Sequence, residues 1–456
     1  MSGLLNSLHI GQSSIFANQK NMSVIGNNVA NANTEGYSRQ EVQMEPWPTV
    51  ERGGLSFGQG VKLGEIARAH DRFVTDRLRN VSEEYGQAEG RATALTELER
   101  IIGIDENSLA GAMDDFFDAW HELSVNPEGE AERSMVIEQG KALATRFRQT
   151  ENSLSGLEDS IDSRLETDLA NINDKLKQVA DLNRRITRAT STGHNPNTAL
   201  DNRDRLMQEL SHDIGSKVYI DEQGSASVYL PKGPTLVQDS QANEILAGEE
   251  TADGLQFTLK SGKTQTTLQG QDFGGEFKGY IDVRDKLLPE IEAGLDGLKH
   301  DLITKVNAKH TAGTSLEGET GLNFFDPGTS YLQVAVTNPE EVAAGKSDAP
   351  GDNETALEIA ELKDAQVAGA NNNSTFVDAY GKISSRVGVE MKQNEFSRES
   401  LQDTLNQLEN RRDEVAGVSI DEAMIDLQRY QSSFQASAQF VSTVDEMMQT
   451  LLGIKR

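Results

Sequence analysis

Side chains that could bind a metal or transfer a proton are scattered along this chain. Its seven histidines share no metal-ligand spacing. The adjacent carboxylates Asp114–Asp115 and Glu83–Glu84 stand on expected helices, where neighbouring side chains diverge by about 100° and do not converge on one substrate. The sequence therefore predicts no metal site and no catalytic residue. The histidines are His9, His70, His121, His194, His212, His300 and His310.

Glycine-rich and nucleophile motifs give no stronger signal. Gly58, Gly60 and Gly64 resemble a fragment of a phosphate loop, but the third glycine of the motif, a following helix and a Lys-Ser/Thr pair are missing. Hairpin glycines are the better interpretation. Gly54-Leu55-Ser56-Phe57-Gly58 matches the spacing Gly-x-Ser-x-Gly, but it lies in the expected extended or hairpin segment and not in the strand-to-helix turn of a nucleophile elbow. Its lack of cysteine excludes disulfides, thiolate catalysis and the usual structural zinc sites. We expect no cofactor and no enzymatic activity.

The elements at the two ends of the chain carry the clearest pattern. Apolar residues there alternate at spacings of four and three, which keeps one stripe of a helix facing a partner helix. The ends are therefore expected to pair as a coiled coil, with the rest of the chain inserted between them. The seam residues of this expected assembly interface are Leu4, Leu8, Ile15, Met22, Ile25, Val29, Leu427, Tyr430, Phe434, Val441, Val444, Met448 and Leu451.

The charge of the chain is concentrated in its middle. The 43 basic and 73 acidic residues give a net charge of −30. Residues 1–50 hold two basic against three acidic side chains and residues 417–456 three against five, so the remaining −27 lies between them. Such an acidic surface repels phosphates, so neither nucleic acid nor anionic lipid is an expected partner.

Near-neutral ends can pack densely against other copies. Residues 430–440 place amides, small side chains and aromatics around the whole helix, where a solvated coiled coil carries charge. We therefore expect burial among neighbouring copies, although an intramolecular bundle remains an alternative. No run of about 18 apolar residues predicts membrane insertion. The first 19 residues lack the basic and continuous apolar regions of a cleaved signal, so we expect no general secretory route.

A run rich in asparagine follows the first expected helix, over residues 4–30. Asparagines compete for backbone hydrogen bonds and glycine admits positive φ, so this run is expected to end the helix in a fixed turn. Residues 38–72 then read as an extended or hairpin segment. The residues of this turn are Asn27, Asn28, Asn31, Asn33, Thr34, Gly36 and Tyr37.

The middle of the chain reads as mainly α with an inserted β domain. Helical periodicity predicts an aromatic helix face at residues 116–120, a helix of roughly 60 Å over 143–186, and helices over 200–214, 281–310, 352–369 and 375–415. Short apolar runs divided by Gly and Pro predict strands within 216–274, and a short strand at 332–336. We expect a terminal coiled-coil domain (1–60 and 417–456), a long helical bundle body (61–215 and 275–416) and a small outer β domain (216–274).

Residues 27–37 resemble the Asn-Asn-x-Ala-Asn-x-Asn-Thr-x-Gly-Tyr signature of flagellar rod, hook and hook-associated proteins, with Glu35 where that signature has proline. Within this group, residues 36–40, 116–127 (FFDAWHELSVNP), 200–211 (LDNRDRLMQELS) and 417–452 resemble the hook-associated protein 1 family. These matches reach both ends and the helical body, and the β domain contributes least. The resemblance implies a structural subunit of the bacterial flagellum at the first hook–filament junction.

The same resemblance implies type III export and localisation as a secreted flagellar component. It implies a ring of about eleven copies contacting the hook protein and the second junction protein, hook-associated protein 3. It also implies delivery by a dedicated export chaperone. The apolar stripe of the C-terminal helix, which a lone monomer would expose, is the expected chaperone site. We expect the ends to be disordered in the monomer and to fold on assembly.

Two alternatives remain from the sequence. A rod or hook axial subunit shares the terminal pattern, but the helices at 116–127 and 200–211 argue against it. A secreted adhesin or enzyme with a β domain on a helical stalk would need a ligand pocket within 216–274, where no cluster of polar or aromatic residues stands out.

Overall fold

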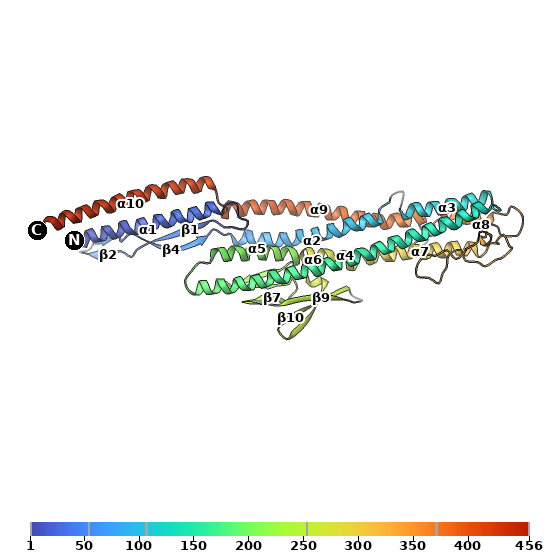
Figure 1. The fold of residues 1–456 in the computed structure, drawn as a ribbon, viewed down its shortest axis with the longest axis horizontal. Helices are drawn as coiled ribbons and strands as arrows, with labels where there is room; N and C mark the ends of the chain where they lie inside the picture. Colours follow the sequence, from blue (N-terminus) through green and yellow to red (C-terminus); the bar gives the residue numbers. More distant parts are fainter. Residues whose placement is uncertain (1, 53–54, 105–107, 252–253, 370–372, 455–456) are drawn as a thin grey trace.

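The molecule is an elongated rod with both chain ends at one tip (Figure 1). The computed structural model describes residues 2–52, 55–104, 108–251, 254–369 and 373–454. Of the expected terminal domain, residues 1, 53–54 and 455–456 therefore lie outside the described residues. Long helices run along most of the rod, and small sheets flank it on one side (Figure 1).

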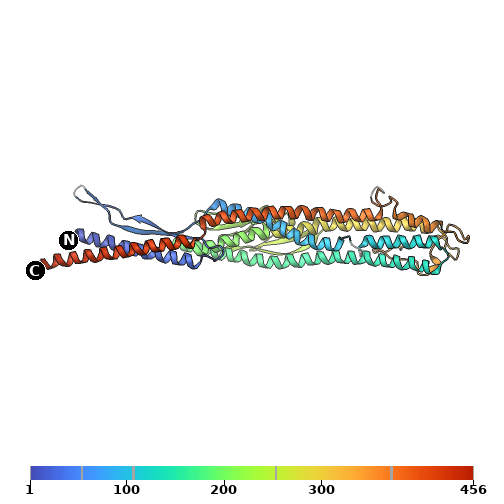
Figure 2. The ribbon, with the colours of Figure 1, turned by 90° about the horizontal axis from the view of Figure 1, so that it is seen from above.

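The end of the rod that holds the chain termini is formed by two helices and a ribbon. α1 (Ser2–Ala30) and α10 (Ile420–Ile454) run side by side in opposite directions (Figures 1 and 2). β1 (Gln40–Pro46) pairs antiparallel with β4 (Val61–Arg68), and β2 (Val50–Arg52) pairs with β3 (Leu55–Phe57). The base of this ribbon packs on α1, and its far end splays away from both helices (Figure 2). The expected hairpin segment is thus present.

Helices of very different length build the body. They are α2 (Arg72–Ile102), α3 (Leu109–Val125), α4 (Glu130–Ser191), α5 (Asn197–Ile214), α6 (Gly275–Asp282), a π-helical turn (Val283–Leu287), α7 (Leu288–His310) and α9 (Phe376–Ala416). Local sequence fixes their ends. The Asp71 carboxylate accepts hydrogen bonds from the backbone N–H groups of Phe73 and Val74 at the start of α2. Gly215, with φ of 69°, ends α5 in the left-handed conformation.

An aromatic core closes the end of the body opposite the chain termini. Phe116 and Trp120 of α3 pack against Phe324 and Phe325 of the loop after α7, with ring centroids 5.3–5.6 Å apart. His310 is fully buried beside them. Asn307 ties the loop to α7, because its side chain bonds the backbone of both Phe324 and Phe325. A short helix, α8 (Glu354–Ala360), covers this end.

Two antiparallel sheets stand between α5 and α6 in the sequence. The first contains β5 (Lys217–Ile220), β6 (Ala226–Tyr229), β7 (Thr235–Gln238) and β8 (Gln241–Ala242) in that order. The second contains β9 (Glu244–Thr251), β10 (Gly254–Ser261) and β11 (Thr264–Gln269), with β10 central.

Two asparagines of α4 hold these sheets. Asn183 donates to the carbonyls of Ala226 and Asp239 and accepts from the Ala226 N–H, all at 2.7–3.0 Å. Asn173 bonds both backbone groups of Ile245 at 2.7 and 2.9 Å. Both asparagines bond strand or turn backbone, and the buried strand side chains Val228, Val237 and Ile245 join the hydrophobic core that α4 lines.

The predicted fold class, mainly α with an inserted β domain and paired terminal helices, is confirmed. Three local predictions were wrong. The long helix α4 begins at Glu130, well before residue 143. Residues 332–336 do not form a β-strand, and a single isolated β-bridge joins Val334 to Phe325. The helix expected over 352–369 ends at Ala360, with one 3-10 turn (Glu361–Lys363) after it.

Candidate assembly interface

Contacts between α1 and α10 fix an antiparallel register. The hydroxyls of Ser14 and Ser437 lie 2.8 Å apart. At Gly11, an added Cβ would lie 2.5 Å from a methyl carbon of Val441, so only glycine allows this approach of the two helices. Residues whose numbers add up to about 451 therefore face each other along the pair.

The predicted seam residues differ in how far they are buried in the single chain. Ile25 and Val444 are buried, whereas Leu451 is exposed near the chain end. The other seam residues are partly buried: Leu4, Leu8, Ile15, Met22, Val29, Leu427, Tyr430, Phe434, Val441 and Met448. A two-helix contact thus covers only one side of these residues.

Both helices also expose large apolar side chains to solvent. They include Leu5 and Phe16 on α1 and Ile425, Phe440 and Met447 on α10, and Phe440 borders the contact because an added Cβ on Gly11 would lie 3.1 Å from its ring. Residues 430–444 of α10 contain no charged side chain. Large exposed apolar patches of this kind mark interaction sites on soluble proteins.

The asparagine-rich turn forms one hydrogen-bonded unit after α1. The Asn28 amide bonds both backbone groups of Gln40, at 2.9 and 3.0 Å, and its oxygen also accepts from the Tyr37 hydroxyl at 2.8 Å. Asn27 donates to the Tyr37 hydroxyl at 3.2 Å, and Asn31 donates back to Asn27. These bonds reverse the chain from α1 into β1.

The remaining residues of the turn differ in role. The Thr34 hydroxyl donates to the side-chain oxygen of Asn31 at 3.3 Å. Gly36 has a φ of 75°, as the sequence predicts. Asn33 is exposed, and the structure assigns its side chain no contact within the turn.

We predict that Gly36→Val destabilises this turn by about 1–3 kcal/mol, because a β-branched residue is strained at positive φ. Space is not the obstacle, since an added Cβ would meet only Arg205 at ordinary contact distance, 3.4 Å. Urea denaturation and the joining of hook to filament would measure the effect. Gly26→Val on α1 is the matched control, since its Cβ would face open space in a helix. Equal stability of the two variants would contradict the prediction.

A buried ionic clamp joins this turn to the body. Asp201 of α5 accepts from the N–H and hydroxyl of Ser38, at 3.3 and 2.8 Å, and from Arg68 of β4 at 2.8 Å. Arg68 also pairs with Asp204 at 2.6 Å. Burial disfavours the charged form of Arg68, but Asp204 and Asp201 outweigh it and raise the pKa of that guanidinium. A backbone bond from Arg39 N–H to the Ala416 carbonyl links the turn to the end of α9.

The sequence did not predict the contacts of this clamp. Asp201 and Asp204 lie in the 200–211 stretch, which drew attention only through its resemblance. Arg68 gave no signal, because its partners are 133 and 136 residues away in the sequence. A cleft of about 440 Å³ lined by Tyr37, Asp201 and Arg412 lies beside the clamp, and Asn197 of α5 holds the ribbon separately by donating to the Ile66 carbonyl at 2.8 Å.

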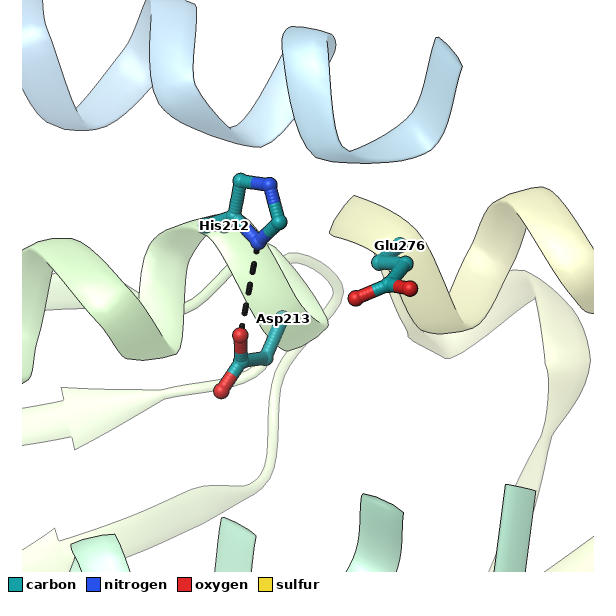
Figure 3. Close-up of side chains that lie close together, drawn as sticks. All are labelled: His212, Asp213 and Glu276. Atoms are coloured by element: carbon teal, nitrogen blue, oxygen red, sulfur yellow. Dashed lines mark hydrogen bonds and ion pairs between the residues drawn. The ribbon is translucent and has the colours of Figure 1, made fainter. Parts of the chain in front are cut away.

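A second polar cluster lies within the body, where α5 meets α6 (Figure 3). His212 and Asp213 of α5 and Glu276 of α6 bring their ligand atoms within 4.8 Å of one another. The His212 ring nitrogens lie 2.9 Å from a Glu89 oxygen and 3.4 Å from an Asp213 oxygen. The scattered histidine positions gave no sign of this grouping, because the carboxylates come from three different helices.

Electrostatics favour a proton in this cluster. Burial disfavours protonated His212, but the hydrogen bond and charge of Asp213, together with Glu89, raise the pKa of His212 above its usual value. Burial would raise the pKa of Asp213, but His212 and Lys175 lower it. Lys175 lies 2.7 Å from Asp213 and occupies that carboxylate. Since a metal needs a neutral imidazole and a free carboxylate, the cluster suits ion pairing between helices better than metal binding.

Within the described residues, none of the helices is apolar enough over a sufficient length to span a bilayer.

Family comparisons match the chain in three places. The model for the flagellar hook-associated protein FlgK helical domain matches residues 95–325, just over half of the 456 residues. The model for the C-terminal region of flagellar basal body rod FlgEFG proteins matches residues 410–454, and that for flagella basal body rod proteins matches residues 8–37. The two ends are thus similar to basal body rod proteins, and the body is similar to the helical domain of FlgK.

Individual relatives extend this similarity over nearly the whole chain. Flagellar hook-associated protein 1 of Bacillus subtilis is 25% identical, with 99% of each chain covered. The Salmonella typhimurium protein of that name is also 25% identical over all of both chains, and the Escherichia coli protein is 28% identical over 84% of this chain and 72% of its own. The structure of the flagellar hook junction protein FlgK from Burkholderia pseudomallei has a TM-score of 0.68 at 15% identity, covering 75% of this chain and 100% of that one.

Proposed function

This chain belongs to the flagellar hook-associated protein 1 (FlgK) family, and we propose that it forms the first ring of the junction between hook and filament. It is a structural subunit of the flagellum, and we assign it no catalysis. The observation that carries the proposal is the terminal helix pair, which exposes large apolar side chains and a charge-free stretch over residues 430–444 at one tip of an otherwise acidic rod. The FlgK helical-domain match over the body favours this role over that of a rod or hook subunit.

The proposed ring contains about eleven copies. In it, α1 and α10 form the inner layer, the helical body a middle layer and the β sheets the outer surface. This order is supported by the position of the sheets on one flank of the body, away from the terminal helices (Figure 1). The hook protein would contact one side of the ring and hook-associated protein 3 the other. We propose the same three domains for these layers: residues 1–60 with 417–456, residues 61–215 with 275–416, and residues 216–274.

Folding of the ends on assembly is the proposed switch that discourages premature association. The contact between two helices buries little apolar surface, so the helix pair is marginal in water. We expect amides of residues 2–35 and 417–454 to exchange hydrogen rapidly in the purified chain and to be strongly protected in assembled flagella. Hydrogen exchange measured on the same peptides in both states tests this. Protection in both states would mean that the pair is stable alone and would contradict the proposed switch.

We also propose that the chain leaves the cell through type III export, with α10 as the chaperone site. Its apolar stripe, which includes Phe434 and Val444, has no partner when α1 is unfolded. A chain truncated after Val415 is expected to lose most of its affinity for the export chaperone in a calorimetric titration. Phe396→Ser, at an exposed apolar position of α9, is the control and should bind normally. Full affinity of the truncated chain would place the chaperone site elsewhere.

A further inference from the structure

The end of α4 that lies nearest the terminal helices is basic, in contrast to the rest of the chain (Figure 1). Residues 182–200 contain three arginines and no carboxylate, although the whole chain carries a charge of −30. The three are Arg184, Arg185 and Arg188; all are exposed, and together they line one shallow hollow of about 530 Å³. We call these three residues the basic patch. A concentration of cations on an acidic protein attracts an acidic partner.

Two cations of the basic patch have no partner in their own chain. Arg184 pairs with Asp181, one turn earlier on α4, at 2.6 Å. Within the described residues, neither Arg185 nor Arg188 forms an ion pair or a side-chain hydrogen bond, and both side chains reach into solvent. The basic patch therefore offers two free guanidinium groups to a partner.

A second hollow lies at the same end of the body and is lined by carboxylates. It is formed by the asparagine-rich turn, the end of α9 and the start of α10, and has a volume of about 550 Å³. We call its acidic residues the acidic patch. They are Glu35, Asp413, Glu414 and Glu422.

The acidic patch is only partly neutralised by its own chain. Arg412 pairs with Asp413 at 2.8 Å, and Arg39 lies 3.7 Å from Glu422. Glu35 and Glu414 are exposed, and no cation of the described part of the chain pairs with either. The acidic patch therefore offers two free carboxylates to a partner.

Both patches lie where the body joins the terminal helices, but on different sides of the molecule. Arg203 of α5 donates to Asn183 of α4, beside the basic patch, at 3.0 Å. Asp201, also on α5, lines the cleft that Arg412 borders beside the acidic patch. The first turns of α5 are thus level with both patches. α2 and α5 stand between α9 and α4, which keeps the two patches of one chain apart (Figure 1).

We propose that the basic patch of one copy docks on the acidic patch of the neighbouring copy; this inference rests on the proposed ring. In the proposed layer order, the terminal helices are innermost and the body forms the middle layer. Both patches lie where these two layers meet, so they stand at a similar distance from the centre of the ring. Two different patches that fit each other form a head-to-tail contact, which closes into a ring or continues as a helix.

Charge complementarity favours a second copy as the partner. Each copy presents two unpaired guanidinium groups on one side and two unpaired carboxylates on another, so each interface pairs all four charges. Nucleic acid and anionic lipid are disfavoured, because the carboxylates elsewhere on the chain repel phosphates. Exposed ion pairs add little affinity and act mainly on orientation and association rate. The contact therefore selects which sides of two copies meet.

Charge reversal tests the docking with the full chain. The double variant Arg185→Glu, Arg188→Glu is expected to enter the junction about ten-fold less than the unchanged chain, because attraction becomes repulsion at every interface. Adding Glu35→Arg and Glu414→Arg to the same chain restores opposite charges across each interface and should restore most of the entry. Circular dichroism should show the same helical signal for every variant.

The control for charge reversal is the double variant Lys232→Glu, Lys263→Glu. Both lysines are exposed in turns of the sheets, and the variant makes the same change in net charge as the reversal of the basic patch. It should enter the junction normally. Normal entry of the basic-patch variant, or no recovery when the acidic patch is also reversed, would overturn the docking.

The absence of cysteine allows a second measurement. Arg188→Cys and Glu414→Cys are made as separate variants, mixed, and assembled into flagella before mild oxidation. We expect a disulfide-linked pair with one copy of each variant in assembled flagella, none in the dispersed chain, and none when Lys263→Cys replaces Arg188→Cys. Absence of the mixed pair, or lost binding to anionic lipid vesicles as the only defect of the basic-patch variant, would overturn the docking. Failure of the unchanged chain to enter the junction would instead contradict the proposed function.

Discussion

Replacing Asp201 with alanine is expected to release the asparagine-rich turn and the ribbon base from the body, at a cost of about 3 kcal/mol. The carboxylate accepts two hydrogen bonds from Ser38 and one from Arg68, and all three residues have side chains that are at most 12% exposed. Without it, the Ser38 N–H loses its partner and Arg68 keeps only Asp204. Hydrogen exchange in residues 36–70 should accelerate strongly, and urea denaturation should detect the lost stability.

Two further variants locate the effect. Asp204→Ala removes only one ion pair and should cost less than Asp201→Ala. Asp403→Ala, at an exposed position of α9, should leave both exchange and stability unchanged. If Asp201→Ala exchanged like the unchanged chain in residues 36–70, the clamp would not be what holds the terminal helices to the body.

Acidification is expected to weaken the aromatic core through His310. Its Nδ1 donates to the Leu322 carbonyl at 2.7 Å, and its Nε2 accepts from the Ala343 N–H at 3.0 Å, so the neutral ring satisfies both partners. Burial lowers the pKa of His310 to about 4, against an ordinary value of 6.5. Because the unfolded chain binds this proton more readily, the contribution is complete above pH 6.5 and is lost as the pH falls towards 4. The difference corresponds to about 3 kcal/mol.

Comparing the unchanged chain with the variant His310→Gln isolates the contribution of His310 to stability. Carboxylates and other histidines titrate in the same range, so the measured quantity is the difference in unfolding free energy between the two chains at each pH from 7 to 4.5. This difference should shrink steadily as the pH falls, since only the unchanged chain loses the His310 contribution. A difference that stays constant with pH would show that His310 does not titrate on unfolding.

The sequence predicted what depends on local periodicity. The four-three spacing gave the terminal helices, and the asparagine run with Gly36 gave a turn whose φ of 75° the structure contains. The sequence predicted helix ends less well where a polar residue interrupts the apolar periodicity. α4 extends back to Glu130 through buried Arg133, whose guanidinium bonds the carbonyls of Pro127 and Val342. A buried cation in an apolar stripe hides the helix from a periodicity argument.

Long-range polar contacts were beyond prediction. Asp201 and Arg68 meet only after α5 has packed beside the ribbon, and His212 meets Glu89 and Glu276 only when three helices converge. Residues 332–336 have strand-like composition, but the loop crosses residue 325 at a single bridge and forms no ladder. In each case the partner lies outside the sequence window on which periodicity depends.

The two asparagine tethers of α4 have a consequence for how this family can diversify. Asn183 and Asn173 grip the sheets by main-chain atoms of Ala226, Asp239 and Ile245. Any residue presents the same main-chain groups, so these bonds place no demand on the outward side chains of the sheets, whereas inward ones such as Val228 and Ile245 are buried in the core. The outward surface is therefore free to change its chemistry while the attachment stays intact. Members of this family can therefore differ in the outward side chains of these sheets and still attach them to α4 through the same two asparagines.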